Sequence, residues 1–321
     1  MKKQTAYILP RKQKNTITML LQKRPLENMP AVASIESFLL KTRGYIFRMP
    51  RPNTPVIMLS SGGLDSTVAS DILMRKYGLH IYPLYIKRGH RRVAKELRSF
   101  YFFTDFFQKQ YPSQYHQPIL INAPIPPREI RWRITDVADA IFNTTTLQRH
   151  GIPMYSSLLN GYAVQYARYL ELTRGVRIRT VFNSFIAKDG VGMAYETFTA
   201  LRSVTMNTIV LTNDSSWQIA SLALERECGY FWEKETLIQW ANHYGMPLEK
   251  TWSCYWGGVY HCGRCDGCRT RKEAYERAGI CDHTVYWTDL PMGMVQSKIH
   301  NATRRITVAL QHSYEKSIQK R

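Results

Sequence analysis

The sequence predicts an α/β protein built around a parallel sheet, and three observations support this expectation. The apolar run Pro55–Leu59 predicts a buried strand, which leads through a glycine pair into apolar residues at helical spacing. Strand and helix patterns then continue to alternate along the chain. The connections between the expected strands are long enough for crossover helices, which indicates right-handed βαβ units. Ligands of such a sheet bind beyond the carboxyl ends of its strands.

Each element is expected from its own local pattern. The expected strands are 16–21, 55–59, 80–86, 118–122 and 176–183. The expected helices are 35–42, 64–77, 90–110, 153–173, 233–250 and 269–278. The helix 64–77 ends at a tyrosine–glycine pair, which is a good C-terminal cap. Helix 233–250 has Gly245 and Pro247 near its end, as expected where a helix stops.

The stretch from Ser60 to Thr67 joins the first of these buried strands to its helix and suits a bound phosphate. Free backbone N–H groups and the positive end of a helix dipole point at one place in such a turn. Gly62 and Gly63 let the backbone approach an anion closely, because no Cβ intervenes. The expected nucleotide-binding residues are Ser60, Ser61, Gly62, Gly63, Leu64, Asp65, Ser66 and Thr67.

Asp65 differs from the rest of this stretch because its charge would repel a phosphate. It either holds Mg²⁺ or braces the turn. The stretch is not a Walker A loop, since no Gly-Lys-Ser/Thr sequence follows. A tight strand-to-helix turn without any ligand is the structural alternative.

Six cysteines occur in the chain, and four of them crowd into fifteen positions. These four are Cys254, Cys262, Cys265 and Cys268. The spacing C-x7-C-x2-C-x2-C suits zinc, which binds four thiolates at about 2.3 Å and leaves no position for water, so the site would be structural. A ferredoxin-type iron–sulfur run is the alternative, but it needs a cysteine where Lys272 stands. We expect Cys228 and Cys281 to be packing residues.

Composition limits the location and partners of the protein. Of 321 residues 44% are hydrophobic, so a substantial core is expected, and no run of 18 apolar residues predicts a membrane span. The N-terminus lacks the apolar region of a secretory signal, so a cytoplasmic location is expected. The net charge of +20 favours anionic partners: ATP, pyrophosphate, nucleic acid or an acidic protein. Residues 1–53 carry 11 Lys and Arg against 2 Glu, or +9, although a solvated basic surface would look the same.

The string Ser-Gly-Gly-Leu-Asp-Ser at 61–66 resembles the pyrophosphate loop of the PP-loop ATP pyrophosphatases. This resemblance implies a HUP-like (adenine nucleotide alpha hydrolase) fold and cleavage of ATP between its α and β phosphates. The domain expectation is therefore a basic N-terminal extension at 1–53, a PP-loop nucleotide-binding domain at 54–250, a zinc-binding segment at 251–286 and a basic C-terminal tail at 287–321.

The cysteine segment resembles that of 7-cyano-7-deazaguanine synthase (QueC). The matching residues are Trp252-Ser253-Cys254-Tyr255, Cys262-Gly263-Arg264-Cys265-Asp266-Gly267-Cys268, Arg271, Ala274-Tyr275, Gly279 and Asp282-His283-Thr284-Val285-Tyr286. Arg88-Gly89-His90-Arg91 is loosely similar to a Gly-Gln-Arg-His segment of that family, and Lys234 sits where the family places a lysine. The resemblance implies the cofactors ATP, Mg²⁺ and Zn²⁺, and catalytic roles for Asp65, Lys234 and Arg91.

The resemblance implies adenylation of 7-carboxy-7-deazaguanine, amide formation with ammonia, and a second adenylation that yields the nitrile. Met154-Tyr155-Ser156-Ser157, Asp189-Gly190 and Tyr195-Glu196-Thr197-Phe198 depart from the family's pattern. We therefore expect the first activation to be retained and the product to be an amide. QueC-like proteins of anti-phage systems such as CBASS are also similar. For them the resemblance implies an amide with a partner protein's N-terminal amine, and the basic extension would suit docking of that partner.

Several alternatives remain open on sequence grounds. An ordinary nitrile synthase using ammonia is the first. A tRNA sulfurtransferase would need a persulfide cysteine near the nucleotide, and no cysteine precedes Cys228. A zinc-stabilised nucleic-acid-binding module would fit the charge but not the intact glycine loop. A homodimer is compatible with the sequence.

Overall fold

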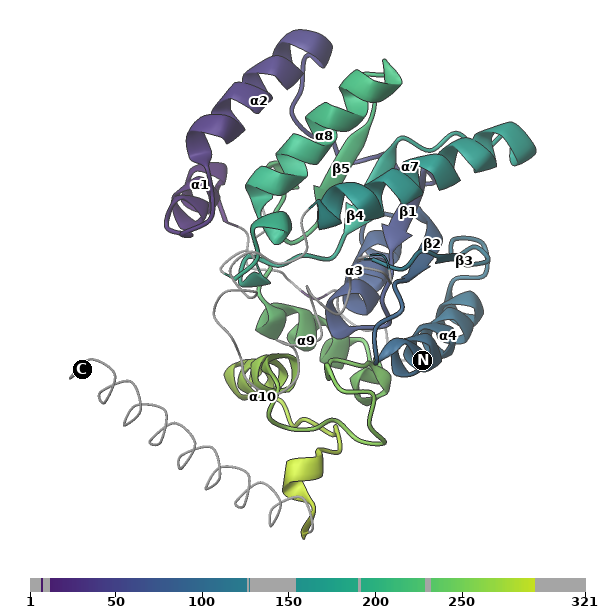
Figure 1. Cartoon of the computed structure of the whole chain (residues 1–321), viewed down its shortest axis with the longest axis vertical. Helices are drawn as coiled ribbons and strands as arrows, with labels where there is room; N and C mark the ends of the chain where they lie inside the picture. The colour runs from purple at the N-terminus through teal and green to yellow at the C-terminus, as the bar shows by residue number, and fades with distance from the viewer. Residues whose placement is uncertain are drawn as a thin grey trace, which may run out of the picture.

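The computed structural model describes residues 7, 12–125, 127, 154–189, 192–228 and 232–291. Its centre is a sheet of five parallel strands in the order β3-β2-β1-β4-β5 (Figure 1). The strands are β1 (Pro55–Leu59), β2 (His80–Lys87), β3 (Ile119–Asn122), β4 (Thr180–Asn183) and β5 (Gln218–Ser221). The expected α/β fold with a parallel sheet is confirmed.

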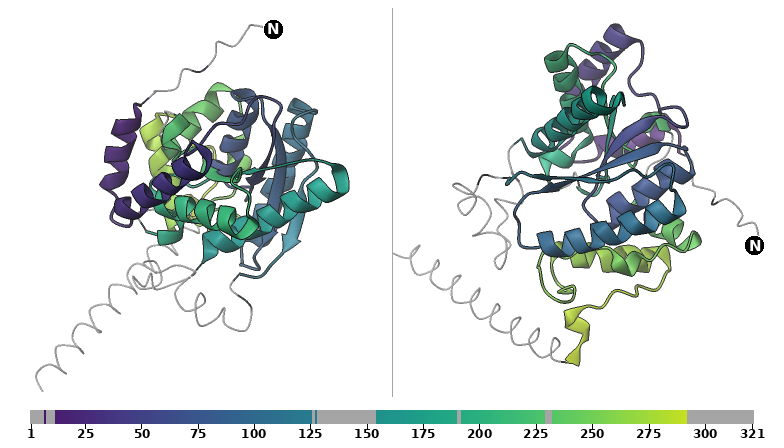
Figure 2. Two further views of the ribbon diagram at one scale, coloured as in Figure 1. Left: turned by 90° about the horizontal axis from the view of Figure 1, so that it is seen from above. Right: turned by 90° about the vertical axis from the view of Figure 1, so that its right-hand side faces the viewer.

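Helices cover both faces of the sheet (Figure 2). One face carries α3 (Leu64–Arg75) and α4 (Val93–Gln110), and the other carries α7 (Tyr155–Arg174) and α8 (Phe198–Thr212). Helices α9 (Lys234–His243) and α10 (Asp266–Ala278) lie beyond α3, with α9 packed on α3 and α10 on α9. Helices α1 (Lys14–Gln22) and α2 (Met29–Arg43) lie on the opposite side of the sheet, with α2 against α8.

Strand β1 shows why the sheet is covered on both faces. Val56, Ile57 and Met58 are all fully buried. Val56 and Met58 pack into the core beneath α3, whereas Ile57 packs into the core beneath α7 and α8. A strand buried on both faces reads as a continuous apolar run, which is the pattern expected of a central strand in a parallel sheet.

The N-terminal extension contains two helices. The expected strand at 16–21 is wrong, because this segment belongs to helix α1. Its Thr and Ile residues favour a strand locally, but Ile17 and Leu21, four residues apart, are both buried in the same core as α7 and α8. The expected helix at 35–42 is the second half of α2, which begins at Met29.

Two elements, α8 and β5, are not among the sequence expectations. Helix α8 is rich in Thr and Val, and it contacts α2 on one side and β5 on another, so it lacks a polar face that would reveal its period. Strand β5 has only four residues. Residues 292–321 of the expected basic tail lie outside the described residues. Within the described part of the chain, no helix is long and apolar enough to cross a membrane.

The sheet order creates a crevice between β1 and β4. The chain moves from β1 outward to β2 and β3, and then returns to the other side of β1 to form β4 and β5. The connections therefore diverge at the carboxyl ends of β1 and β4, where α/β proteins bind ligands. The glycine loop after β1 and the segment after β4 meet at this position.

Candidate functional site

The glycine loop occupies residues 60–63 between β1 and α3. Ser66 Oγ in the first turn of α3 accepts a hydrogen bond from Ser61 N at 3.2 Å, and Ser61 Oγ accepts one from Gly63 N at 3.3 Å. The loop is fastened from outside by Ser99 Oγ and Trp252 N, which both donate to the Gly62 carbonyl. The start of α3 therefore presents its N–H groups from a fixed loop, which is the arrangement that binds a phosphate.

The two glycines of the loop have different structural roles. Gly62 has a φ of +70°, and a Cβ there would lie 2.6 Å from the carbonyl oxygen of Glu96. Gly63 has a φ of −76° and forms the N-terminal cap of α3. A Cβ on Gly63 would meet only the Ser61 hydroxyl at 3.1 Å and the Trp252 carbonyl oxygen at 3.7 Å. Gly62 is therefore required by the fold itself, whereas Gly63 is free to serve a ligand.

Asp65 and Lys234 form an ion pair at the crevice. The Lys234 Nζ lies 2.9 Å from Asp65 Oδ2, so the pair joins the first turn of α3 to the first turn of α9. Burial alone would lower the pKa of Lys234, but Asp65 and Asp189 outweigh it and raise the pKa above its usual value. Asp65 Oδ1 is buried and has no hydrogen-bond partner among the described residues. Asp65 thus uses one oxygen to link α3 to α9, while its other oxygen has no partner in the described part of the chain.

Two further carboxyl groups lie near this pair. Burial raises the pKa of Asp189 to about 6; Lys234 opposes this shift and Asp65 adds to it. Burial also raises the pKa of Glu196 well above its usual value, and Asp189 adds to the shift. Arg88, Arg92 and Lys234 act in the opposite direction on Glu196. The crevice therefore combines several carboxyl groups with three cationic side chains, and burial favours the protonated form of two of these carboxyl groups.

The raised pKa of Asp189 predicts a pH-dependent gain from Asp189→Asn. A carboxyl group whose pKa rises from 3.8 to about 6 on folding is penalised above pH 6, and the penalty disappears as the pH falls towards 4. Without added Mg²⁺, the melting temperature of Asp189→Asn should exceed that of the wild type by roughly 2–6 °C at pH 8, and the gain should vanish only below the ordinary pKa of 3.8.

Asp214→Asn is the control of opposite sign for this measurement. Burial alone would raise the pKa of Asp214, but hydrogen bonds from Ser216 and Arg179 outweigh it and lower the pKa to about 2. Its replacement should therefore lower the melting temperature at pH 8. Equal melting curves for Asp189→Asn and the wild type across this pH range would contradict the placement of Asp189.

An arginine pair projects from the segment after β2. Glu96 accepts hydrogen bonds from Arg92 Nε at 2.6 Å and from the Tyr85 hydroxyl at 3.0 Å. His90 Nε2 lies 2.9 Å from the same carboxylate, and Arg88 lies 3.9 Å away. Burial alone would raise the pKa of Glu96, but Arg92, His90 and Arg88 hold it well below its usual value. Glu96 is thus a fixed anion that hydrogen-bonds Arg92 and lies within ion-pair distance of Arg88.

The structure separates Arg91 from this arrangement. Arg91 is exposed, and its catalytic role stays a prediction from the resemblance. Arg88 and Arg92 are only 19% and 25% exposed, and both act on the pKa of Glu196. The sequence signal that could have identified them is Glu96, which lies four residues after Arg92 on the same helical face.

Aromatic rings adjoin the same side chains. The Arg88 guanidinium lies 5.3 Å from the centre of the Tyr155 ring, and that of Arg92 lies 4.8 Å from the Tyr255 ring. Tyr155 and Tyr195 contact each other with ring centres 4.8 Å apart. Three chain segments therefore meet around the two arginines. Those of Tyr155 and Tyr195 depart from the resemblance, and that of Tyr255 belongs to the cysteine segment. Planar cationic and aromatic groups of this kind suit a flat, heteroaromatic ligand.

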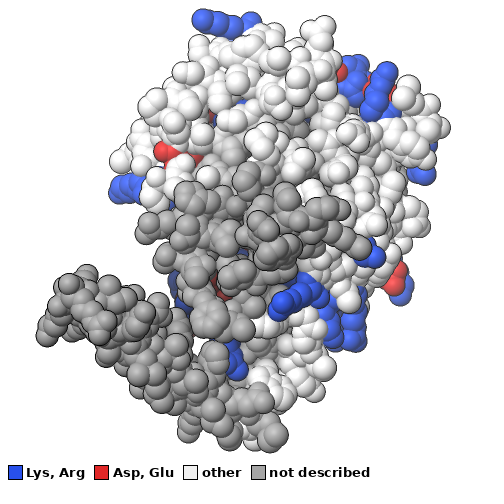
Figure 3. Space-filling view, viewed as in Figure 1, with Lys and Arg blue, Asp and Glu red and all other residues white. Residues whose placement is uncertain are grey.

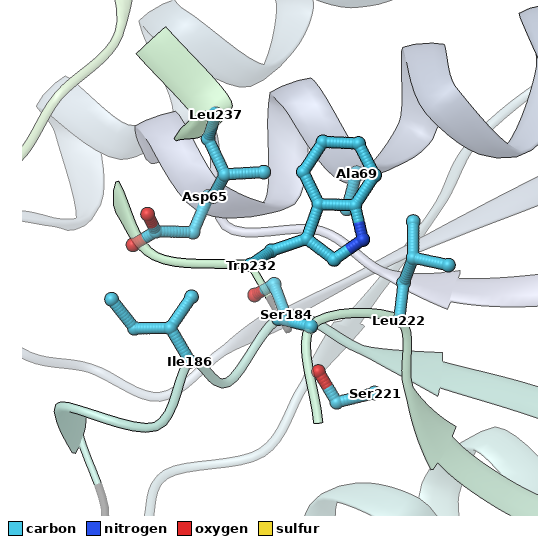
Figure 4. Close-up of a pocket in the computed structure, with 9 residues that line it drawn as sticks. Asp65, Ala69, Ser184, Ile186, Ser221, Leu222, Trp232 and Leu237 are labelled. Atoms are coloured by element: carbon cyan, nitrogen blue, oxygen red, sulfur yellow. The ribbon is translucent and has the colours of Figure 1, made fainter. Parts of the chain in front are cut away.

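A small pocket lies between Asp65 and residues at the carboxyl ends of β4 and β5 (Figure 4). Ser184 after β4 and Ser221 at the end of β5 supply hydroxyl groups, and Trp232 forms an apolar wall. Ile186 and Leu237 line the pocket close to Asp65. The pocket therefore adjoins Asp65 in the first turn of α3.

The four cysteines predicted as metal ligands come together. The Sγ atoms of Cys254, Cys262, Cys265 and Cys268 all lie within 4.8 Å of one another. The Cys262–Cys268 and Cys254–Cys265 sulfur distances are 3.8 and 3.9 Å. A tetrahedron with metal–sulfur bonds of about 2.3 Å has edges of about 3.8 Å. The cluster could therefore hold a metal ion such as zinc.

Backbone groups and Arg271 hold the cysteine segment in shape. Trp256 N and Cys262 N donate to Cys254 Sγ at 3.3 and 3.2 Å, and Cys265 N donates to Cys262 Sγ at 3.3 Å. Buried Arg271 on α10 donates to Thr251 Oγ1 and to the Leu248 carbonyl, both at 2.7 Å. N–H groups aimed at sulfur favour the thiolate form that a metal requires.

Positive charge is spread over the surface. On the face shown in Figure 3, Lys and Arg side chains of the described residues lie in several separate groups. A nucleic-acid-binding module would present one continuous basic patch. The Lys and Arg side chains of the described residues do not form such a patch on this face.

Comparisons with known proteins find a match to the cysteine segment and others that cover most of the chain. The family model described as "Queuosine biosynthesis protein QueC" matches residues 227–279, which include Lys234 and the four cysteines. The 7-cyano-7-deazaguanine synthase of Nautilia profundicola is 25% identical over 232 residues, covering 72% of this chain and 97% of that protein. The enzyme of Methanothrix thermoacetophila is 24% identical over 238 residues, with the same coverage of both chains.

Two solved structures show a weaker likeness to the chain. The chain is 11% identical to the U34-tRNA thiolase NcsA from Methanococcus maripaludis with its [4Fe-4S] cluster, with a TM-score of 0.32 over 77% of this chain and 71% of that one. It is 10% identical to an NH3-dependent NAD synthetase from Campylobacter jejuni, with a TM-score of 0.25 over 80% of this chain and 98% of that one. The chain is thus similar to 7-cyano-7-deazaguanine synthases over most of its length, and to the QueC family model over residues 227–279.

Proposed function

We propose that this divergent QueC-family enzyme adenylates the carboxylate of 7-carboxy-7-deazaguanine and transfers the acyl group to an amine. In the first step a carboxylate oxygen attacks the α-phosphorus of ATP, an O–P bond forms and pyrophosphate leaves. In the second step the amine nitrogen attacks the acyl carbon, a C–N bond forms and AMP leaves. The observation that carries the proposal is that the glycine loop, the Asp65–Lys234 pair and the arginine pair lie together at the crevice between β1 and β4.

Different residues of the crevice would have different roles in the first step. The loop N–H groups at the start of α3 and the Lys234 ammonium would neutralise the departing pyrophosphate. The free Asp65 Oδ1, together with Asp189, would hold Mg²⁺, which supplies charge neutralisation and orientation of the phosphates. Ser184, Ser221 and Trp232 would receive the part of the nucleotide opposite its phosphates.

The arginine pair and Glu196 would serve the acceptor side. We assign the carboxylated base to Arg88 and Arg92, because both are held by Glu96 beside Tyr155 and Tyr255. Arg91 is the alternative that the resemblance offers. Glu196 would accept the proton that the amine loses, because burial raises the pKa of its carboxyl group and so makes its carboxylate more basic.

The expected product is an amide. The loop and the cysteine segment resemble the family closely, while the segments with Tyr155, Asp189 and Glu196 depart from it, and these are the segments around the arginine pair. The nitrile also requires the new amide to be held for a second adenylation. A changed pocket should therefore impair the second adenylation more than the first. An ordinary 7-cyano-7-deazaguanine synthase that uses ammonia is the alternative.

The amine donor is ammonia or the N-terminus of a partner protein. A protein acceptor would fit a role in anti-phage defence, and an acidic partner would be attracted to the basic residues of 1–53. If so, higher salt should slow the association, because it screens charge over about 10 Å at 0.1 M.

A product assay tests the proposal. With ATP, Mg²⁺, the carboxylated base and ammonium, we expect AMP and pyrophosphate in equal amounts and one AMP for each amide, detected by mass spectrometry. Nitrile accumulation with two AMP for each product would favour the alternative. No AMP with ammonium, but AMP with a candidate partner protein, would identify a protein acceptor. No AMP with either amine would contradict the proposed activity.

A sulfur-transfer reaction is opposed by the cysteines themselves. Outside the metal cluster the described cysteines are Cys228 and Cys281. Burial raises the pKa of the Cys228 thiol well above its usual value, so little of the reactive thiolate forms, and Cys228 packs against the core beneath α3. Cys281 is exposed after α10. Cys228 is therefore a packing residue, as expected, whereas the expectation that Cys281 packs is wrong, because its side chain is exposed.

A further inference from the structure

The segment from α1 to α2, residues 14–43, contacts the helix that follows Glu196. Glu27, in the connection between α1 and α2, accepts hydrogen bonds from Phe198 N at 2.8 Å and from Thr199 N at 2.9 Å. The Thr199 hydroxyl donates to the same carboxylate at 2.6 Å, and Asn28 N donates to that hydroxyl at 2.9 Å. A carboxylate from the N-terminal extension therefore caps the start of α8.

This cap completes the first turn of α8. The first turn of a helix leaves backbone N–H groups without partners inside the helix. In α8, the N–H of Ala200 is satisfied by Thr197 Oγ1 at 3.0 Å, and those of Phe198 and Thr199 are satisfied by Glu27. The negative charge of Glu27 also interacts favourably with the positive end of the helix dipole. The direction in which α8 begins is thus set by a residue of the extension.

The turn before this helix start carries two groups of the crevice. Residues Ala194–Glu196 form a single 3₁₀ turn that runs directly into Thr197 and α8. Tyr195 contacts Tyr155, and Glu196 interacts with Asp189, Arg88 and Arg92. A shift in the start of α8 would therefore move both side chains relative to the arginine pair.

The same segment is anchored so that it can act as a rigid support. Ile17, Leu21, Ile35 and Leu39 are buried in the core beneath α7 and α8. Glu36 on α2 pairs with Arg202 of α8 at 3.0 Å and with Arg226 after β5. Arg24 lies 3.5 Å from Glu233, the residue directly before Lys234. The segment thus contacts both the Glu196 side and the Lys234 side of the crevice.

We propose that residues 14–43 position the catalytic crevice and that Glu27 is the positioning residue of this element. Glu27 itself touches no reacting group; it fixes the 3₁₀ turn that presents Tyr195 and Glu196 to the arginine pair. Its effect on turnover rests on the proposed function, whereas its effect on the turn does not. The extension therefore has a structural task in the site that is separate from any role of its basic charge.

The test compares Glu27→Gln with the wild type in two measurements. Glutamine keeps the length of the side chain but has only one oxygen and no charge, so one of the two capped N–H groups loses its partner. Hydrogen exchange of the ligand-free protein should be about tenfold faster in the peptide spanning residues 194–200. In the product assay, kcat for AMP release should fall roughly tenfold while the KM for ATP changes less than twofold, because the glycine loop is untouched.

Asn28→Ala is the matched control. The Asn28 side chain caps α2 through Ala31 N at 3.0 Å, but its contact with Thr199 uses the backbone. This variant weakens the same segment without uncapping α8, so exchange in peptide 194–200 and kcat should stay within twofold of the wild type. Glu27→Asp keeps the charge near α8 and should retain more activity than Glu27→Gln.

The outcomes separate this proposal from the proposed function. Wild-type exchange in peptide 194–200 of Glu27→Gln would overturn the positioning role, whatever the activity. Equal losses in Glu27→Gln and Asn28→Ala would also overturn it, because they would reflect stability alone. Faster exchange in Glu27→Gln combined with no AMP release by the wild type would support the positioning role and contradict only the proposed reaction.

Discussion

Replacement of Gly62 by alanine should reduce ATP-dependent turnover at least about 30-fold. Gly62 has a φ of +70°, which costs an L-residue roughly 1–2 kcal/mol. The added Cβ would also lie 2.6 Å from the Glu96 carbonyl oxygen and 2.7 Å from Phe100 N, and overpacking of this kind costs roughly 1–3 kcal/mol. Both of these contacts are backbone atoms of α4, which cannot rotate away.

The loop must therefore yield instead of the helix. Ser99 Oγ would lose its hydrogen bond to the Gly62 carbonyl, and so would Trp252 N. A combined cost of roughly 2–5 kcal/mol, expressed as displacement of the loop from the start of α3, corresponds to a loss of about 30-fold to more than 1,000-fold in rate. Isothermal titration with ATP and the AMP-release assay would measure the loss.

Gly63→Ala and Gly63→Val provide the comparison. Alanine at position 63 has an allowed φ and meets only the Ser61 hydroxyl, which can rotate, so the melting temperature should stay near that of the wild type. Valine adds a branched side chain where a phosphate would approach, so ATP affinity should fall in a folded protein. Unchanged ATP affinity and turnover in both Gly62→Ala and Gly63→Val would show that the nucleotide binds elsewhere.

The features that the sequence predicts correctly are those encoded over a few residues. The strand, glycine turn and helix around Gly62 extend only from Pro55 to Arg75, and the four cysteines lie within fifteen positions. Their local spacing contains most of the geometry, so the loop and the sulfur cluster follow directly. The sheet also follows, because a continuous apolar run such as Val56–Met58 indicates burial on both faces.

The features that the sequence does not predict depend on partners far away in the chain. Glu27 and Phe198 are 171 positions apart, and no local pattern connects them. The segment of helix α1 is expected to be a strand because its Thr and Ile residues favour strands. Its burial in the core beneath α7, which decides for a helix, is not visible in the local sequence. The choice among Arg88, Arg91 and Arg92 likewise depends on which side chains Glu96 orients.

Replacement of Cys265 by serine should remove the metal and leave the C-terminal third of the chain unfolded or insoluble. In small zinc peptides, metal binding supplies about 10–16 kcal/mol of folding free energy, which is as large as the whole stability of a typical domain. Serine does not provide a thiolate, and the remaining three sulfurs would keep an open, exchangeable position. Metal analysis of the purified protein, together with its visible spectrum, would distinguish zinc from an iron–sulfur cluster.

The loss should extend to ATP binding although no cysteine touches the glycine loop. Trp252 N donates to the Gly62 carbonyl at 3.1 Å, and the ring of Tyr255 lies against Arg92 at 4.8 Å. The cysteine segment thus supports the loop at one end and the arginine pair at the other. Cys281→Ser, at an exposed position outside the cluster, should change neither metal content nor activity. A folded, fully active Cys265→Ser protein without metal would show that the cluster does not support the fold. A protein that stays folded without metal but loses ATP affinity would show that its role is to hold Trp252 and Tyr255 in place.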